Sequence, residues 1–250
     1  MKKINKKLLN YCLTTPTNSI FNDLIVPGSI KKVFQPMNTD KRHMWFISEK
    51  PAKHLLVAHL DAVTDLDNKT YIKKDVLMNK GLDDRLGLYT CLYLQAKYQC
   101  FDILLTDNEE TGQSTAQHFS CPDYNFIIEF DKAGIEEFVM YDTSDDLGEA
   151  IIESTGYIEG FGSYSDIADI STDTASVNWC ICYREYHTKN SHVLISEYMQ
   201  SISDFELFFS ENKDNRFYKN EDDWNDYHET ELEEYWNSYG YNAYQRGYNV

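Results

Sequence analysis

The chain has 250 residues, enough for one large α/β domain or two small ones, and its formal net charge is −18. So strong a negative charge argues against nucleic acid or an anionic membrane as a partner, and no apolar run approaches transmembrane length. The six cysteines contain no C-x-x-C pair, and no apolar signal segment follows the basic start of the chain, so we expect reduced thiols and a cytoplasmic protein.

The spacing of apolar residues predicts strands that alternate with helices. In chain order we expect a helix over 3–13, strands over 30–35, 43–48 and 54–58, a loop with a short strand over 62–80, a helix over 84–98, a strand over 102–106, a helix near 112–119, strands over 125–130 and 137–141, a helix or loop over 145–154, a strand over 177–183 and a helix over 195–210. This alternation favours an α/β fold, with a three-layer α/β/α domain.

The composition changes near the end of the last predicted helix. From residue 211 onward Asp, Glu, Asn, Tyr and Trp dominate, and aliphatic residues are few. Such a segment has little with which to form a core. We therefore expect the domain to span residues 1–210, and residues 211–250 to be an acidic, Tyr/Trp-rich tail that is partly ordered at most.

Carboxylates and histidines stand where predicted strands end. In order along the chain these residues are His59, Asp61, Glu109, Glu110, Asp131 and His187. The pair Asp83-Asp84 opens the predicted helix 84–98. Because sites in open α/β sheets form beyond the carboxyl ends of the strands, these side chains can converge on one crevice.

Imidazole together with carboxylate is a donor set that suits zinc, and also manganese or cobalt. Two metals about 3.5–4 Å apart need a ligand that bridges them. Asp83 is the natural bridge, since it lies between the others in sequence. His59 and Asp131 would then complete one metal site, and Glu110 and His187 the other.

Two residues remain beside these ligands. Glu109 is free to act as the general base on a metal-bridging water. Asp61 can accept the second N–H of His59 and fix its tautomer. His192, in the same loop as His187, is the alternative last ligand. Each residue alone has a structural explanation, such as a helix N-cap for Asp83-Asp84, but the combination favours a metal site.

The order of these residues resembles that of the co-catalytic di-zinc exopeptidases, which include aminopeptidases and relatives of acetylornithine deacetylase. The resemblance spans roughly residues 50–195 and is carried by His59-x-Asp61, Gly81-Leu82-Asp83-Asp84-Arg85-Leu86-Gly87, Glu109-Glu110-Thr111-Gly112, Asp131 and Tyr186-His187-Thr188. It implies a zinc exopeptidase-like fold with a central mixed, mostly parallel sheet, and two Zn²⁺ ions as cofactors.

The resemblance also implies roles for individual residues. The first aspartate of the pair, Asp83, bridges the metals, and Glu109 is the base. A cis Asp83–Asp84 peptide bond is expected to direct the Asp83 carboxylate between the two metals. Ser165-Asp166 resembles a Ser-Asp element of the family. Asp166 and Asp84 are therefore expected behind the ligands or near the substrate amine.

The chain is compact compared with these relatives. Only 21 residues separate Asp61 from Asp83, and only 55 separate Asp131 from His187. These connections leave no room for the domains that the tetrahedral aminopeptidases and the deacetylase branch insert there. We therefore expect an open crevice, and a monomer or small homo-oligomer.

The main functional prediction is a di-metal hydrolase that cleaves amide bonds of short peptides or small amides, with aminopeptidase as the expected activity. One alternative keeps the site and makes the protein a small-molecule deacetylase or amidase. The other is a non-catalytic binding protein that uses the fold and the acidic tail.

Overall fold

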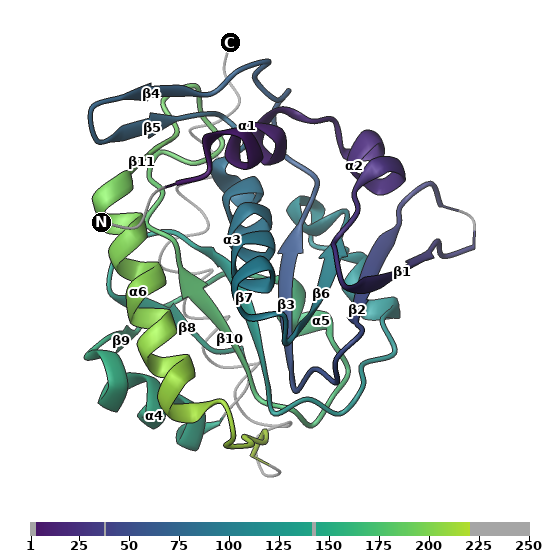
Figure 1. The fold of residues 1–250 in the computed structure, drawn as a ribbon, viewed down its shortest axis with the longest axis vertical. Helices are drawn as coiled ribbons and strands as arrows, with labels where there is room; N and C mark the ends of the chain where they lie inside the picture. Colours follow the sequence, from purple (N-terminus) through teal and green to yellow (C-terminus); the bar gives the residue numbers. More distant parts are fainter. Residues whose placement is uncertain (1–3, 38, 142–143, 221–250) are drawn as a thin grey trace, which may run out of the picture.

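A mixed eight-stranded sheet forms the centre of the protein in the computed structural model, which describes residues 4–37, 39–141 and 144–220 (Figure 1). Its strands, in spatial order, are β1 (Ser29–Phe34), β2 (His43–Ser48), β6 (Phe101–Thr106), β3 (His54–His59), β7 (Phe126–Lys132), β10 (Ser176–Cys180), β8 (Glu137–Val139) and β9 (Ile158–Glu159). The four central strands, β6, β3, β7 and β10, run parallel, whereas β1, β2 and β8 pair antiparallel to their inner neighbours.

The central strands are apolar on both faces, as expected for parallel strands covered on both sides. All six residues of β3 are buried. Leu56 and Ala58 belong to the core on one face, and Leu55 and Val57 to the core on the other. This burial fixes the register of β3 and therefore the position of His59, its last residue.

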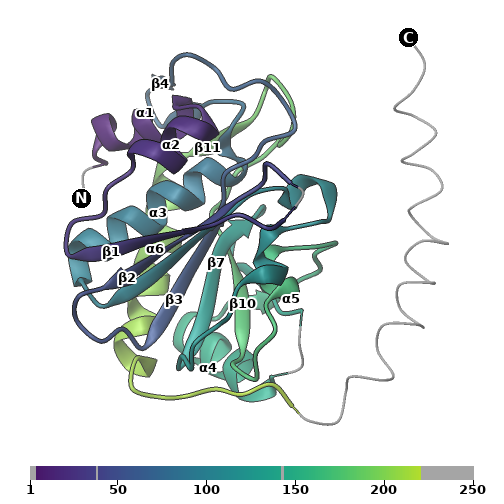
Figure 2. The same ribbon diagram turned by 90° about the vertical axis from the view of Figure 1, so that its right-hand side faces the viewer.

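Helices cover the two faces unequally, which gives the predicted three layers. The helices are α1 (Lys6–Thr14), α2 (Thr17–Asp23), α3 (Leu82–Tyr98), α4 (Asp145–Thr155), α5 (Asp166–Asp169) and α6 (Ile195–Asn212), with short 3-10 turns η1 (Glu109–Thr111) and η2 (Thr115–His118). Figure 2 shows α1 and α3 on one side of the sheet and α5 on the other. The second layer is thin, since its core consists of the short α5 and η2 packed on the sheet.

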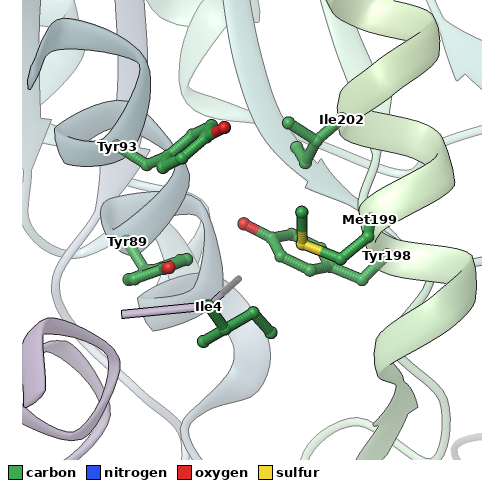
Figure 3. Close-up of a pocket in the computed structure, with 6 residues that line it drawn as sticks. All are labelled: Ile4, Tyr89, Tyr93, Tyr198, Met199 and Ile202. Carbon is green, nitrogen blue, oxygen red and sulfur yellow. The ribbon is translucent and has the colours of Figure 1, made fainter. Parts of the chain in front are cut away.

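Aromatic side chains fill the space between α3 and α6. A shallow pocket there is lined by Ile4, Tyr89, Tyr93, Tyr198, Met199 and Ile202 (Figure 3). The Tyr198 hydroxyl lies 2.9 Å from Thr90 Oγ1, and the Tyr89 hydroxyl accepts the Asn5 N–H at 3.1 Å. No lining residue carries a carboxylate or an imidazole. The pocket therefore belongs to helix packing and offers no metal ligand.

A small antiparallel sheet stands beside the main one. It contains β4 (Tyr71–Lys73), β5 (Val76–Met78) and β11 (His192–Leu194), in the order β11-β5-β4. Asp75, in the β4–β5 turn, accepts the Ser196 N–H on its carboxylate at 3.0 Å and the Ile195 N–H on its carbonyl at 2.7 Å. The hairpin therefore caps the first turn of α6.

Several expected elements differ from those observed. The helix predicted near 112–119 is only the 3-10 turn η2, because Gly112 takes a left-handed φ of 67° that no α-helix continues. The strand predicted over 177–183 ends at Cys180, and Cys182 has a φ of 66°. Four short elements, α2, β9, α5 and β11, were not predicted.

The region around residue 211 is part of the folded body. Helix α6 continues to Asn212, and Phe217 is buried against Phe126. The Ala175 N–H donates to the Phe217 carbonyl. The rest of the predicted tail, 221–250, lies outside the described residues. Within the described part of the chain, no helix has the length and apolarity needed to cross a bilayer.

Candidate metal centre

Strands β3, β6 and β7 end near the amino end of α3 (Figure 1). The predicted ligands come together there. Asp83 lies at the centre of the cluster. Its Oδ1 is 3.1 Å from Nε2 of His59, and its Oδ2 is 3.0 Å from Nε2 of His187. The two oxygens of one carboxylate thus face two different imidazoles.

Each imidazole has a further carboxylate of its own. Glu110 Oε2 lies 2.9 Å from His187 Nε2, and Asp131 Oδ1 lies 3.7 Å from His59 Nε2. Donor atoms of His59, Asp83 and Glu110 all lie within 4.8 Å of one another. The cluster is therefore divided into two halves that share Asp83.

The sequence Asp83-Asp84-Arg85-Leu86-Gly87 has a local explanation. The Asp83–Asp84 peptide bond is cis, as the resemblance predicted, and both residues depart from helical φ/ψ values. The guanidinium of Arg85 is buried and donates to the carbonyls of Cys12, Thr15 and Leu60. It therefore ties the first helix to the segment that follows β3.

Gly87 and Asp84 fit together closely. The Gly87 N–H donates to Asp84 Oδ1 at 3.0 Å, and a Cβ at Gly87 would lie 2.2 Å from that oxygen. Only glycine leaves room for this contact. Asp84 itself is fully buried behind Asp83, and burial together with the Asp131 charge raises the pKa of Asp84.

A tight turn presents Glu109 and Glu110 to the cluster. It is bounded by left-handed residues, Asn108 with φ 73° and Gly112 with φ 67°. The Asp61 carboxylate accepts the N–H groups of Glu109 at 3.2 Å and of Glu110 at 3.1 Å. Asp61 Oδ1 also lies 3.4 Å from His59 Nδ1. One carboxylate therefore holds the turn and faces the imidazole.

The loop after β10 brings His187, and not His192, to the cluster. Glu185 and His187 have φ values of 55° and 58°, in the left-handed region that non-glycine residues rarely occupy. His192 lies in β11, where its Nδ1 is 2.8 Å from the Asn190 carbonyl.

Three buried residues for which no role was predicted, Tyr183, Asn178 and Glu129, support the ligands. The Tyr183 hydroxyl lies 2.7 Å from the Asp131 carbonyl and 3.1 Å from Asp131 Oδ1. Asn178 Oδ1 accepts the Asp131 N–H at 2.9 Å, and Asn178 Nδ2 donates to Ser165 Oγ. Ser165 in turn donates to Glu129, which is fully buried. Glu129 and Asn178 lie within strands and Tyr183 lies just after one, at positions where apolar core residues are expected. Only the polar character of Glu129 and Asn178 in an apolar run indicates another role.

Asp166 is also fully buried, at the start of α5. The hydroxyls of Thr106 and Ser114 donate to its two carboxylate oxygens. The structure places Asp166 beneath the turn that carries Glu109 and gives it no exposed surface.

The crowded carboxylates shift one another's protonation. Burial and the charge of Asp83 raise the pKa of Asp131 to about 8. Burial raises the pKa of Glu109 to about 9, although the neighbouring His59 opposes the shift. Hydrogen bonds with Asp83 and Glu110 raise the pKa of His187 to about 10. Carboxylates this close retain protons unless a positive charge neutralises them.

These residues fit divalent ions. Two imidazoles and three carboxylates are donors that zinc, manganese and cobalt accept. Glu110 Oε1 and Asp84 Oδ2 are buried and have no hydrogen-bond partner among the described residues. The donor set, its division around Asp83 and its surplus of negative charge are all consistent with divalent ions.

Known structures share this fold. The aminopeptidase PepT from Bacillus cereus aligns with a TM-score of 0.53 at 10% identity, over 82% of this chain and 96% of that one. A tripeptidase from Staphylococcus aureus aligns with a TM-score of 0.59 at 12% identity, over 83% and 98%. The TET1 peptidase from Pyrococcus horikoshii, which can assemble into a tetrahedron or an octahedral shell, aligns with a TM-score of 0.55 at 10% identity, over 76% and 92%.

No protein-family model matches the chain, and no curated protein matches its sequence. At identities this low, the likeness to solved structures establishes the fold alone. The expected α/β fold with a central mixed, mostly parallel sheet is therefore confirmed, and it is the fold of these peptidases.

Proposed function

We propose that the protein is a di-metal hydrolase of amide bonds, with aminopeptidase as its expected activity. One observation carries the proposal: the two oxygens of Asp83 face His59 at 3.1 Å and His187 at 3.0 Å. A carboxylate between two imidazoles is the arrangement that a bridging ligand requires. Fold neighbours that are named as an aminopeptidase and a tripeptidase support the choice of reaction.

Five residues would hold the ions. His59 and Asp131 belong to one half of the cluster, His187 and Glu110 to the other, and Asp83 to both. Two zinc ions, or manganese or cobalt, would supply Lewis-acid polarisation of the scissile carbonyl and of a water molecule.

The remaining chemistry is assigned to Glu109. Glu109 is only 8% exposed as a residue, and its Oε2 lies 3.7 Å from His59 Nε2, at the edge of the cluster. In this position Glu109 takes a proton from the attacking water and delivers it to the leaving amine. Asp61 would support the step, because it accepts the backbone N–H of Glu109 and its Oδ1 lies 3.4 Å from His59 Nδ1.

A small-molecule deacetylase or amidase would use the same residues, and the site geometry does not separate it from a peptidase. A non-catalytic binding protein fits less well. It would have no need of a general base, the role proposed for Glu109.

Two measurements test the proposal. Metal analysis of the purified protein should find about two equivalents of zinc, manganese or cobalt per chain. A panel of aminoacyl amides, short peptides, N-blocked peptides and small acyl amides should show hydrolysis only in the metal-loaded protein. Cleavage of free amino-terminal substrates alone would identify an aminopeptidase, and cleavage of acyl amides alone a deacetylase. Metal binding without hydrolysis of any member would contradict the enzyme.

A further inference from the structure

The loop that carries Glu109 and Glu110 is attached to the rest of the protein at both of its ends. It begins at Thr106, the last residue of β6, and ends at Ser114. Backbone and side-chain bonds between Asp107 and Thr115 close its neck. The middle of the loop is less protected, since residues 111–113 are exposed.

One buried carboxylate contacts both ends. Thr106 Oγ1 donates to Asp166 Oδ2, and Ser114 Oγ donates to Asp166 Oδ1. Ser114 Oγ also accepts the Ala116 N–H at 2.9 Å, which starts η2. Asp166, Thr106 and Ser114 are each completely buried. Asp166 therefore contacts both ends of the loop, Thr106 and Ser114, at the same time.

The two residues that flank Asp166 are held by contacts with the sheet. Ile167, which follows Asp166, packs in the core of the second face, and Ser165, which precedes it, donates to Glu129 of β7. The Ile167 N–H also points to Glu129 Oε2 at 3.5 Å. The position of Asp166 is therefore set by β7, the strand that also carries Asp131.

We propose that Asp166 is a positioning residue that fixes the loop 106–114 relative to β7, and so fixes the direction in which Glu109 and Glu110 point. This inference rests on the proposed function for its catalytic consequence. A substrate-amine contact is incompatible with the complete burial of Asp166. Its action must pass through the hydroxyls of Thr106 and Ser114.

The test removes those hydroxyls and leaves the carboxylate intact. Thr106→Val is nearly isosteric and Ser114→Ala removes one oxygen, so both variants should fold. Thr90→Val is the matched control: Thr90 is equally buried, and its hydroxyl is also bonded, to Leu86 and Tyr198, but in the packing of α3 and α6.

The first readout does not depend on activity. Amide hydrogen exchange of residues 107–113 should accelerate by about tenfold in Thr106→Val and Ser114→Ala, and remain unchanged in Thr90→Val. The second readout is kinetic. Because small misplacements of reacting groups cost large factors in rate, kcat should fall by about ten- to a hundredfold while KM changes little. The double variant should add little to the stronger single one.

The outcomes separate this inference from the proposed function. If the wild-type protein hydrolyses no amide, the proposed function fails, and the exchange measurement still decides the role of Asp166. If the wild type is active but both hydroxyl variants keep its exchange rates and its kcat, Asp166 does not position the loop. Equal losses in Thr106→Val and Thr90→Val would also overturn the proposal, because they would indicate a general loss of stability.

Discussion

Glu109 and Glu110 are adjacent in the chain but face different tasks in the proposed mechanism. The base must accept a proton, which an amide cannot do. Glu109→Gln should therefore keep its metal and its fold but lose about 10²- to 10⁴-fold in kcat. The exposed Glu153→Gln serves as control and should match the wild type. Near wild-type turnover in Glu109→Gln would show that another group is the base.

Glu110 contacts His187 at 2.9 Å and is proposed to complete one half of the cluster. Glu110→Ala should therefore lower the metal content from two ions to one per chain, as measured by elemental analysis after gel filtration. Retention of both ions would remove Glu110 from the ligand set.

His54 gives stability a pH dependence that is separate from the metal centre. Its ring is packed among Phe101, Phe126 and Phe209, and burial lowers its pKa to about 4. The unfolded chain would bind a proton at His54 near pH 6.5, whereas the folded chain binds it only near pH 4. Stability from His54 is therefore complete above pH 6.5 and is lost as the pH falls toward 4.

The expected size of this effect is roughly 3 kcal/mol between pH 7 and pH 4, from the shift in pKa. The measurement is the difference in urea unfolding free energy between the wild type and His54→Leu at each pH, since this difference cancels the other titrating groups. A pH-independent difference for His54→Leu would contradict the assignment.

At the scale of single residues, most members of the cluster could be predicted from the sequence. His59, Asp83, Glu110, Asp131 and His187 could be selected because each follows or opens an element with a clear apolar pattern. Supporting residues such as Glu129 and Tyr183 could not be selected in this way. Their roles depend on which strands are neighbours, and β10 lies beside β7 only in the folded sheet.

Among the elements, the β4–β5 hairpin makes an unusual contact with α6. Helix α6 has no side-chain cap of its own, and Asp75 supplies one from another part of the chain. Asp75→Ala should lower stability by about 1 kcal/mol, the usual value of an N-cap, and lower the thermal midpoint by a few degrees. Glu149→Ala, an exposed change within α4, is the control. An unchanged midpoint would mean that the Asp75 contact contributes nothing in solution.

The long elements were predictable because their apolar patterns are compatible with only one type of secondary structure. Helix α3 and strands β3, β6 and β7 are of this kind. The short elements depend on contacts that the local sequence does not encode. Strand β11 has three residues and exists because β5 pairs with it, and α5 has four residues, placed by the bonds of Ser165 and Asp166. The apolar run 177–183 looked like one strand, but its last residues leave the sheet to bring Tyr183 to Asp131.

For the whole molecule, the folded body should not depend on residues 221–250, which contain few aliphatic side chains. A chain that ends at Asn220 should unfold cooperatively at the same urea midpoint as the full chain. Phe217→Ala, in contrast, should lose roughly 3 kcal/mol, because that ring is buried. A lower midpoint for the shortened chain would assign a structural role to residues 221–250.

The short connection between Asp61 and Asp83 also affects how the protein can assemble. The connection between Asp61 and Asp83 contains only the β4–β5 hairpin, which is too small to wall off a chamber. We expect a monomer or small oligomer that acts on short substrates, unlike the shells reported for the TET1 peptidase. Light scattering should give a mass of one to a few chains. A mass near twelve chains would mean that another surface drives assembly.

The small sheet has a consequence for how the protein folds. β5 lies shortly before Asp83 and β11 shortly after His187, and the two strands pair through Met78 and His192. These segments are distant in sequence, so their pairing closes a long chain loop, whose entropy must be lost before any contact compensates for it. We therefore expect the two halves of the candidate metal centre to come together late in folding. Ions bound there would stabilise the completed native state, and would do little to accelerate its formation.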